Sequence, residues 1–181
     1  MIRVLGVDPG LTGAITLLSD KDLEVWDIPT FELLKNKKKR NELDMHGLGK
    51  ILSDLRPFAS KAYVEEVHAM TKKGVKQGVT SMFSFGWVCG AIRQALVDRD
   101  FAIEMVSPRK WQLALGVKKG SDGSLLRASE LLPSYADKWS RKMDHNRAAA
   151  SLIAYYGLHQ QANKAIVRPT RRRLRLKVSP Y

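Results

Sequence analysis

Three acidic residues have the type and the setting of catalytic rather than packing residues. Asp8 ends an apolar, β-branched segment and precedes a turn that contains glycine, Glu65 lies within an apolar run, and Asp144 begins an amphipathic segment. An unpaired carboxylate is costly to bury, so a carboxylate inside an apolar strand requires a cation, hydrogen-bond donors or water. Taken singly, Asp8 could initiate a turn and Asp144 could cap a helix, so it is their combination that indicates a site.

A cluster of these carboxylates would repel itself unless divalent cations neutralised it. Mg²⁺ prefers oxygen ligands and retains several waters, which suits a few carboxylates together with a substrate phosphate. Two such ions about 4 Å apart can clamp an in-line phosphoryl displacement, in which one ion activates water and the other stabilises the leaving oxygen. We therefore predict that Asp8, Glu65 and Asp144 are catalytic residues that bind Mg²⁺, with Mn²⁺ as a substitute and two ions in each site.

These acids depend on strands and helices to bring them together. Apolar, β-branched runs bounded by Gly, Pro and Asp predict strands at residues 2–7, 13–18, 23–28, 61–67 and 101–106. Apolar residues at helical spacing predict helices at residues 44–55, 79–98, 108–115, 124–132 and 143–158. Three strands followed by alternating helices and strands predict an α/β fold, a mixed sheet with helices on its faces. In such a fold two strand ends and a helix start could meet.

Length and composition are typical of one soluble globular domain. The chain has 181 residues, of which 44% are hydrophobic and 27% charged, which is enough to bury a core. We expect a nuclease domain at residues 1–160 and a basic tail at residues 161–181. The single cysteine, Cys89, excludes an internal disulfide and a zinc site of paired cysteines. Without an export signal or a run of about 18 apolar residues, we expect a cytoplasmic protein with no membrane partner.

Positive charge is concentrated in two segments. The formal net charge is +13, from 31 Lys and Arg against 18 Asp and Glu. Residues 35–40 hold five basic residues and residues 164–181 hold seven, so without these twelve the balance is 19 against 18, or +1. A nearly neutral body with two basic appendages is typical of a protein that grips a polyanion, most simply a nucleic acid. Solvated surface or a localisation signal is the alternative interpretation.

Four motifs in order along the chain resemble those of one nuclease family. They are VDPGLTGAI at residues 7–15, YVEEV at residues 63–67, VSPRKW at residues 106–111 and DHNRAAA at residues 144–150. Together they resemble RuvC-type Holliday junction resolvases of the ribonuclease H-like superfamily, particularly phage-type members. The resemblance implies a ribonuclease H-like fold with a five-stranded mixed sheet flanked by helices. It also implies a homodimer with two active sites and Mg²⁺-dependent, symmetric nicking of two strands of a four-way junction.

The resemblance assigns the three acids one by one. By motif position, Asp8 matches the first-strand aspartate of the family, Glu65 the glutamate of its fourth strand, and Asp144 an acid of its final helix. After the glutamate, cellular members often place an aromatic residue that wedges into the junction centre, whereas this chain has His68. The stacking role is therefore not expected here.

The last motif departs from the family pattern. Members commonly have a second metal-binding side chain three residues from the helix acid, and the third residue after Asp144 is Arg147. We predict His145 as the substitute ligand, since neutral imidazole can bind a metal, with Glu66 and Asp137 as alternatives. Arg147 could instead contact the scissile phosphate, or form an ion pair with Asp144 one turn earlier.

Basic residues supply the candidate DNA contacts. Some lie in the two basic segments, and others lie in the loop after the Glu65 strand or near the third motif. Phosphate contacts would make binding weaken steeply with salt without conferring sequence preference. The aromatic residues of segment 82–87 are expected instead in the core or in a dimer face. The predicted DNA-binding residues are Lys37, Lys38, Lys39, Arg40, Lys72, Lys73, Lys76, Lys110, Lys118, Lys119, Arg147, Arg171, Arg172 and Arg173.

The sequence thus predicts a magnesium-dependent endodeoxyribonuclease that resolves four-way (Holliday) junctions by two-metal hydrolysis. One alternative is a less selective nuclease that also cuts flaps and forks. A second is a junction-binding protein with an impaired site, which Arg147 favours. A third is a sugar kinase or actin-like ATPase, which also has an Asp-x-Gly-x-Thr turn after its first strand. The length of this chain argues against the third, because those folds need two such lobes.

Overall fold

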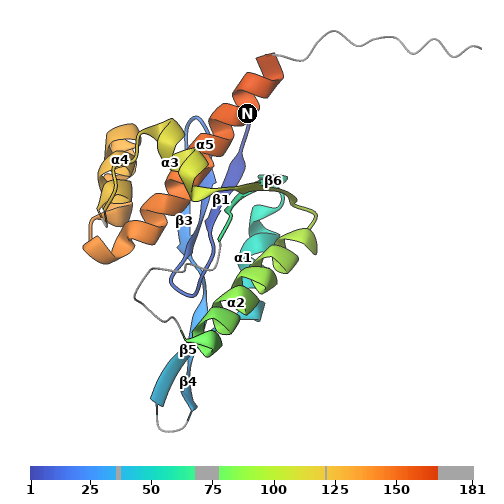
Figure 1. Cartoon of the computed structure of the whole chain (residues 1–181). Coiled ribbons are helices and arrows are strands. Elements are labelled where there is room, and N and C mark those ends of the chain that lie inside the picture. The colour runs from blue at the N-terminus through green and yellow to red at the C-terminus, as the bar shows by residue number, and fades with distance from the viewer. Residues whose placement is uncertain (36–37, 68–77, 121, 167–181) are drawn as a thin grey trace, which may run out of the picture.

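The structure of the chain, a computed structural model, describes residues 1–35, 38–67, 78–120 and 122–166 (Figure 1). Among these residues the main sheet consists of β1 (Val4–Asp8), β2 (Ala14–Leu18), β3 (Leu23–Asp27), β6 (Lys61–Glu65) and β7 (Ala102–Val106). A separate hairpin consists of β4 (Thr30–Lys35) and β5 (Lys38–Leu43). The helices are α1 (Met45–Leu55), α2 (Val79–Val97), α3 (Pro108–Leu115), α4 (Gly123–Leu131) and α5 (His145–Ile166), with 3₁₀ turns η1 (Pro133–Trp139) and η2 (Lys142–Asp144) before α5.

The main sheet is mixed, and β1 is its central strand. The strand order is β3-β2-β1-β6-β7, in which β1 to β3 form an antiparallel meander. β6 runs parallel to β1, and β7 runs parallel to β6. Parallel neighbours need long crossovers, and the chain supplies them through α1 and α2. The predicted α/β fold with a five-stranded mixed sheet is therefore confirmed.

Two hydrophobic layers hold the sheet from both faces. Leu5 and Val7 of β1 pack with α1 and α2, whereas Val4 packs in the layer that contains α3, α4 and α5. Successive residues of a strand point to opposite faces, and all three side chains are fully buried. Figure 1 shows the same arrangement, with α1 and α2 on one side of the sheet and α5 on the other. The end of β1, where Asp8 lies, is thus part of a rigid frame.

Gly6 allows α5 to lie directly against β1. A Cβ at position 6 would come within 2.2 Å of the Ala150 carbonyl oxygen and 2.3 Å of the Ala154 amide nitrogen. Both are backbone atoms, so relief requires a shift of the helix. We expect Gly6→Ala to lower the free energy of unfolding by roughly 3 kcal/mol, which urea denaturation would measure.

Gly90, on α2, is the matched control for this substitution. No described atom lies within 4 Å of a Cβ added there, so Gly90→Ala should meet no clash. It should raise stability by up to about 1 kcal/mol, because alanine favours helix more than glycine does. Equal stability of the two variants would contradict the close approach of α5 to β1.

Part of the first basic segment lies on strands that the sequence pattern does not predict, because β4 and β5 pair as an antiparallel hairpin. Across this hairpin Lys39 Nζ lies 2.9 Å from Glu32 Oε1. Its apolar residues Phe31 and Leu34 are exposed, so the alternation of buried and exposed residues that marks a half-buried strand is missing. Figure 1 shows the hairpin extending away from the body. The hairpin carries the first basic segment outward.

The final helix is longer than predicted. α5 begins at His145 and continues to Ile166, beyond the predicted helix end at residue 158 and the predicted start of the tail at residue 161. The remainder of the tail, residues 167–181, lies outside the described residues. In the part of the chain that the structure describes, no helix combines the length and apolarity that a membrane span needs.

Candidate active site

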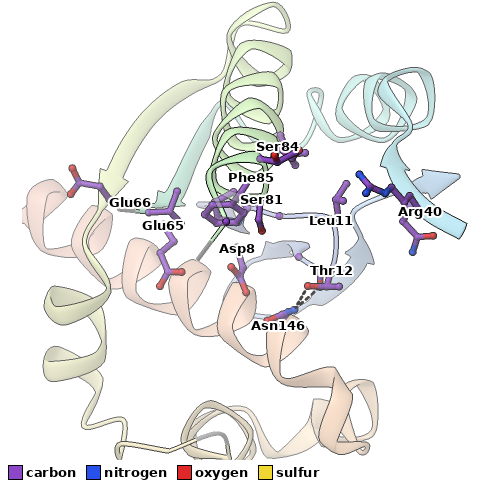
Figure 2. Close-up of a pocket in the computed structure, with 18 of the residues that line it drawn as sticks. Asp8, Leu11, Thr12, Arg40, Glu65, Glu66, Ser81, Ser84, Phe85 and Asn146 are labelled. Atoms are coloured by element: carbon purple, nitrogen blue, oxygen red, sulfur yellow. Dashed lines mark hydrogen bonds between the residues drawn. The ribbon is translucent and has the colours of Figure 1, made fainter. Parts of the chain in front are cut away.

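Asp8 and Glu65 end two neighbouring parallel strands. β1 and β6 pair with Val7 opposite Val64, so the next residue on each strand emerges at the same edge of the sheet. Both residues line an open cleft of about 1260 Å³. Figure 2 shows their side chains in this cleft, each coming from the end of its strand. Open α/β sheets commonly place their ligand sites at such carboxyl ends.

The walls of the cleft come from segments far apart in the sequence. They are the β1–β2 turn, β5, the first half of α2 and the first turn of α5 (Figure 2). The turn is tight, since a Cβ at Gly13 would lie 2.0 Å from the Asp8 carbonyl oxygen. Arg40 supplies positive charge, Ser81 a hydroxyl group, and Phe85 an apolar surface. The cleft therefore combines charged, hydroxyl and apolar side chains next to a basic hairpin.

The two carboxyl groups are perturbed by their setting. Burial, together with the nearby charge of Glu65, raises the pKa of Asp8 from 3.8 to about 8. Burial also raises the pKa of Glu65, which the hydrogen bond from Trp111 Nε1 to Glu65 Oε1, at 2.9 Å, opposes. Trp111 is fully buried, so it holds the Glu65 carboxylate in a fixed direction. Without a cation, Asp8 retains a proton at neutral pH.

A cation that binds at Asp8 must displace this proton, so binding should depend on pH. Below about pH 8, where Asp8 is protonated, the apparent Mn²⁺ affinity should fall by up to about tenfold per pH unit. Above that pH the affinity should become constant. Calorimetric Mn²⁺ titrations between about pH 6 and pH 9 measure this dependence. An affinity that does not change across this range would contradict the binding of Mn²⁺ at Asp8.

Asp144 does not line the cleft, and its carboxylate is occupied by Arg141. The Asp144 side chain is only 5% exposed. It accepts hydrogen bonds from the Arg141 backbone nitrogen at 3.0 Å and from Arg141 Nη2 at 2.7 Å. These hydrogen bonds lower the pKa of Asp144. In this structure the pair secures the turn that leads into α5.

The predicted set of four metal ligands is not assembled in the structure. Asp8 and Glu65 share the cleft, whereas Asp144 faces Arg141 and His145 is exposed, with Nδ1 3.3 Å from the Lys142 carbonyl oxygen. Within the described residues, no three His, Cys, Asp or Glu side chains lie close enough to hold one ion. In this structure Asp8 and Glu65 come together, and Asp144 does not join them. A helix turns by about 100° per residue, so neighbouring positions at its start face different surroundings.

The other candidates from the last motif also lie elsewhere. Arg147 Nε is 2.6 Å from Asp27 Oδ1, whereas its nearest contact with Asp144 is 3.9 Å. The ion pair with Asp27 of β3 thus dominates over the predicted pair with Asp144. Glu66 borders the cleft, but Figure 2 shows its carboxylate pointing away from the site. Asp137 is exposed on η1.

Asn146 is the α5 side chain that reaches the cleft, and it is absent from the predicted ligands. Its Nδ2 donates to the Thr12 carbonyl oxygen at 2.6 Å and to Thr12 Oγ1 at 3.1 Å. Ala150 and Ala154, four and eight residues later, contact Gly6 on β1. Residues four apart share one face of a helix, so Asn146 lies on the face of α5 that packs against β1. The spacing of Asn146 and the two alanines is the sequence signal that could have identified this residue.

Comparisons with known proteins agree with this architecture. No protein-family model matches the chain. The chain is 29% identical to the chloroplastic Holliday junction resolvase MOC1 of Chlamydomonas reinhardtii, across 74% of this chain but only 17% of that protein. The structure of Thermus thermophilus RuvC matches with a TM-score of 0.53 at 15% identity, covering 88% of this chain and 97% of RuvC. The chain has the RuvC fold. The predicted ribonuclease H-like architecture is confirmed with it.

The structure of T. thermophilus RuvC in complex with a Holliday junction substrate matches equally well. Its TM-score is 0.54 at 14% identity, and the match covers 88% of this chain and 96% of that one. The resemblance to RuvC-type resolvases that the four motifs indicate is therefore confirmed by sequence and by fold. The chain spans about a sixth of the length of the curated relative.

The predicted basic residues occupy several surfaces of this RuvC fold. Lys39 and Arg40 of β5 line the cleft. Lys110 on α3, and Lys118 and Lys119 after it, are exposed and do not line the cleft. The side chain of Lys38 is outside the described part of the structure, as are the residues Lys37, Lys72, Lys73, Lys76, Arg171, Arg172 and Arg173.

Proposed function

We propose that the protein is a divalent-metal-dependent endonuclease of branched DNA, with four-way junctions as its main substrate. The observation that carries the proposal is the adjacency of Asp8 and Glu65 at the carboxyl ends of β1 and β6, in an open cleft of a RuvC fold. The name of the relative, a Holliday junction resolvase, supports the choice of substrate. Lys39 and Arg40 on the neighbouring hairpin suit a phosphate backbone that enters the cleft.

The chemistry of the cleft fits Mg²⁺ or Mn²⁺. Its donors are the carboxylates of Asp8 and Glu65 and the amide of Asn146, and oxygen donors of this kind are those that Mg²⁺ prefers. Burial raises the pKa of Asp8, which is the state expected of a carboxylate that lacks its cation. A bound ion supplies positive charge that polarises a phosphate and lowers the pKa of water.

The side chains of the cleft position the groups around such an ion. Trp111 Nε1 orients one Glu65 oxygen and leaves the other for a ligand. Asp8 loses its proton when it becomes a ligand. Arg40 lies where it can hold a phosphate oxygen, and the apolar surface of Phe85 limits the access of bulk water. These roles together favour hydrolysis of a phosphodiester whose position is fixed by the protein.

The proposal includes a homodimer with two such sites. The segment 82–87 of α2 was expected in the core or in a dimer face, and two of its aromatic residues are largely exposed, Phe83 by 74% and Trp87 by 54%. An exposed apolar patch of this kind marks an interaction surface more often than a free one. A second copy of the chain would cover this patch and present two clefts to the two strands that are nicked.

Cleavage of synthetic DNA tests the proposed function. A four-way junction, a flap, a fork and a plain duplex of the same sequences are incubated with the protein and Mg²⁺ or Mn²⁺. We expect paired nicks at symmetric positions in the junction and little cleavage of the duplex. Equal cleavage of flaps and forks would support the broader nuclease instead. No cleavage of any substrate with either ion would refute an endonuclease.

A junction-binding protein without cleavage is the second candidate. The specific observation in its favour is that, in the described part of the chain, Asp8 and Glu65 meet in the cleft without Asp144, which is paired with Arg141. Gel-shift and cleavage assays on the same junction separate the two candidates. Tight binding that is unaffected by Mg²⁺, with no nicking, would identify the binding protein.

The basic tail should contribute affinity rather than chemistry. Residues 167–181 contain six basic residues and no acidic residue. Each phosphate contact contributes about 0.9 to the slope of log affinity against log salt, so deletion of these residues should lower the slope by several units. The nicking rate at saturating protein should change less than about threefold, since the tail is remote in sequence from the cleft residues. An unchanged slope would exclude the tail from DNA binding.

A further inference from the structure

We propose that Asn146 is the ligand that α5 contributes to the metal site, a neutral oxygen in the place where an acid was expected. On this assignment the cleft holds a metal ion firmly only when a DNA phosphate adds its own negative charge. The inference rests on the proposed function and deepens it, because it names the residue of this chain that links metal binding to the substrate.

Asn146 is placed in the cleft by the packing of α5 against β1. It lies in the first turn of α5 and lines the same cleft as Asp8 and Glu65. Figure 2 shows these three side chains grouped around one space, each carried by a different element. The ridge of α5 that contains Asn146 is held against β1 by the contacts of Ala150 and Ala154 with Gly6. The position of Asn146 relative to Asp8 is therefore set by the packing of the core.

The hydrogen bonds to Thr12 fix the orientation of the Asn146 amide. A carbonyl oxygen can only accept hydrogen bonds, so the 2.6 Å contact with the Thr12 carbonyl oxygen requires that Nδ2, not Oδ1, faces Thr12. The contact of Nδ2 with Thr12 Oγ1 at 3.1 Å reinforces this orientation. Both donated hydrogen bonds use the nitrogen, so the amide oxygen is the atom that Asn146 can offer to a cation. Amide oxygens are ordinary ligands of hard divalent ions.

The described residues supply limited negative charge to the cleft. Asp8 and Glu65 carry two negative charges at most, which one divalent ion neutralises, and Glu32, which also lines the cleft, is paired with Lys39 at 2.9 Å. Asp144 is unavailable while Arg141 holds it at 2.7 Å, and the carboxylate of Glu66 points away from the cleft in Figure 2. A second ion, or a tightly held first one, therefore requires negative charge from outside the protein. The phosphate diester of bound DNA is the source that the proposed function provides.

Calorimetric titration of Mn²⁺ into the full-length, DNA-free protein at about pH 8.5 tests the assignment, because Asp8 is then ionised. Asn146→Ala should weaken Mn²⁺ binding by roughly tenfold, since it removes one ligand. Asn146→Asp should tighten Mn²⁺ binding by roughly tenfold, since it adds a charged ligand. Asp8→Asn serves as the reference for loss of the site. Thermal unfolding of each variant checks that the chain is folded.

The aspartate variant separates a ligand role from a structural one. A carboxylate cannot donate a hydrogen bond to the Thr12 carbonyl oxygen, so a purely structural Asn146 would make Asn146→Asp at least as damaging as Asn146→Ala. The ligand role predicts the opposite order of Mn²⁺ affinity. It also predicts how much DNA changes the Mn²⁺ requirement. The Mn²⁺ concentration that half-saturates junction nicking should lie closer to the Kd measured without DNA in Asn146→Asp than it does in the native chain.

The outcomes distinguish this inference from the proposed function. If Asp8→Asn loses Mn²⁺ binding while both Asn146 variants keep the native Kd within about twofold, the cleft binds metal and Asn146 is not a ligand. If Asp8→Asn also keeps the native Kd, the cleft is not the metal site and the proposed function fails with it. If both Asn146 variants weaken Mn²⁺ binding equally, Asn146 only supports the turn and the ligand assignment is overturned.

Discussion

Asp8→Asn should abolish nicking and at the same time stabilise the metal-free protein. Asp8→Asn removes one of the two carboxylate charges that would hold the ion, and the charge of a bound ion is worth several kcal/mol in the transition state, so activity should fall by at least about a thousandfold. Binding of a four-way junction should be retained, because the basic residues on β5 are untouched. Loss of chemistry with retained binding is the pattern expected of a metal ligand.

The stability gain follows from the pKa of Asp8. The folded protein holds this proton up to about pH 8, whereas an ordinary carboxyl group loses it near 3.8. Between these values the folded state binds more protons than the unfolded state, so native stability falls as the pH rises. The Asp8→Asn variant has no titrating carboxyl group at position 8, so it does not lose stability in this way as the pH rises. Its advantage at pH 8 should be several kcal/mol, or roughly 10 °C or more in Tm, because about four pKa units separate the folded value from the ordinary one.

Thermal unfolding of the metal-free proteins at about pH 5 and pH 8 measures this effect. The difference in Tm between Asp8→Asn and the native chain should grow with pH. Asp20→Asn is the matched control, because Asp20 is an exposed acid in the turn before β3, outside the cleft. It should change neither Tm nor nicking. A native level of nicking in Asp8→Asn would remove Asp8 from the site.

Asp144→Asn should have the opposite profile, lower stability with unchanged Mn²⁺ binding. The buried Asp144 carboxylate accepts hydrogen bonds from the backbone and the guanidinium of Arg141. Hydrogen bonds to charged groups contribute about 2 kcal/mol, so the variant should lose roughly 4–8 °C in Tm at neutral pH. Mn²⁺ binding should be retained, because Asp144 does not line the cleft.

The pH dependence provides an independent check on Asp144. Arg141 lowers the pKa of Asp144, so the stabilisation is fully present above the ordinary carboxyl range and disappears as the pH falls through the lowered folded value. The difference in Tm between Asp144→Asn and the native chain should therefore shrink in acid. A variant with native Tm and weakened Mn²⁺ binding would instead return Asp144 to the metal site, as its motif position implies.

Burial has different consequences for the carboxyl groups of Asp8 and Asp144. Burial raises the pKa of Asp8, and this is a cost to the metal-free fold. Asp144 is also buried, but Arg141 compensates its charge. A perturbed carboxyl group with no cationic partner in the described structure is the better candidate for a metal ligand.

Much of the site could be predicted from the sequence because it depends on strands. Apolar runs predict β1 and β6, and a residue at the end of a strand can emerge only at one edge of the sheet. The prediction that Asp8 and Glu65 lie close together therefore required only that the two strands be parallel neighbours, which the order of elements favours. The mixed sheet and its helical layers follow from the same periodic patterns.

What the sequence could not decide lies on α5 and on the hairpin. Whether position 144, 145 or 146 faces the cleft depends on the rotation of α5 about its axis, which the contacts of Ala150 and Ala154 with Gly6 set. The hairpin formed by β4 and β5 has exposed apolar side chains and so lacks the pattern by which strands are recognised. By itself the sequence determined the fold and two acids of the cleft. Only packing between distant segments decided that the amide of Asn146, rather than the carboxylate of Asp144, lines the cleft.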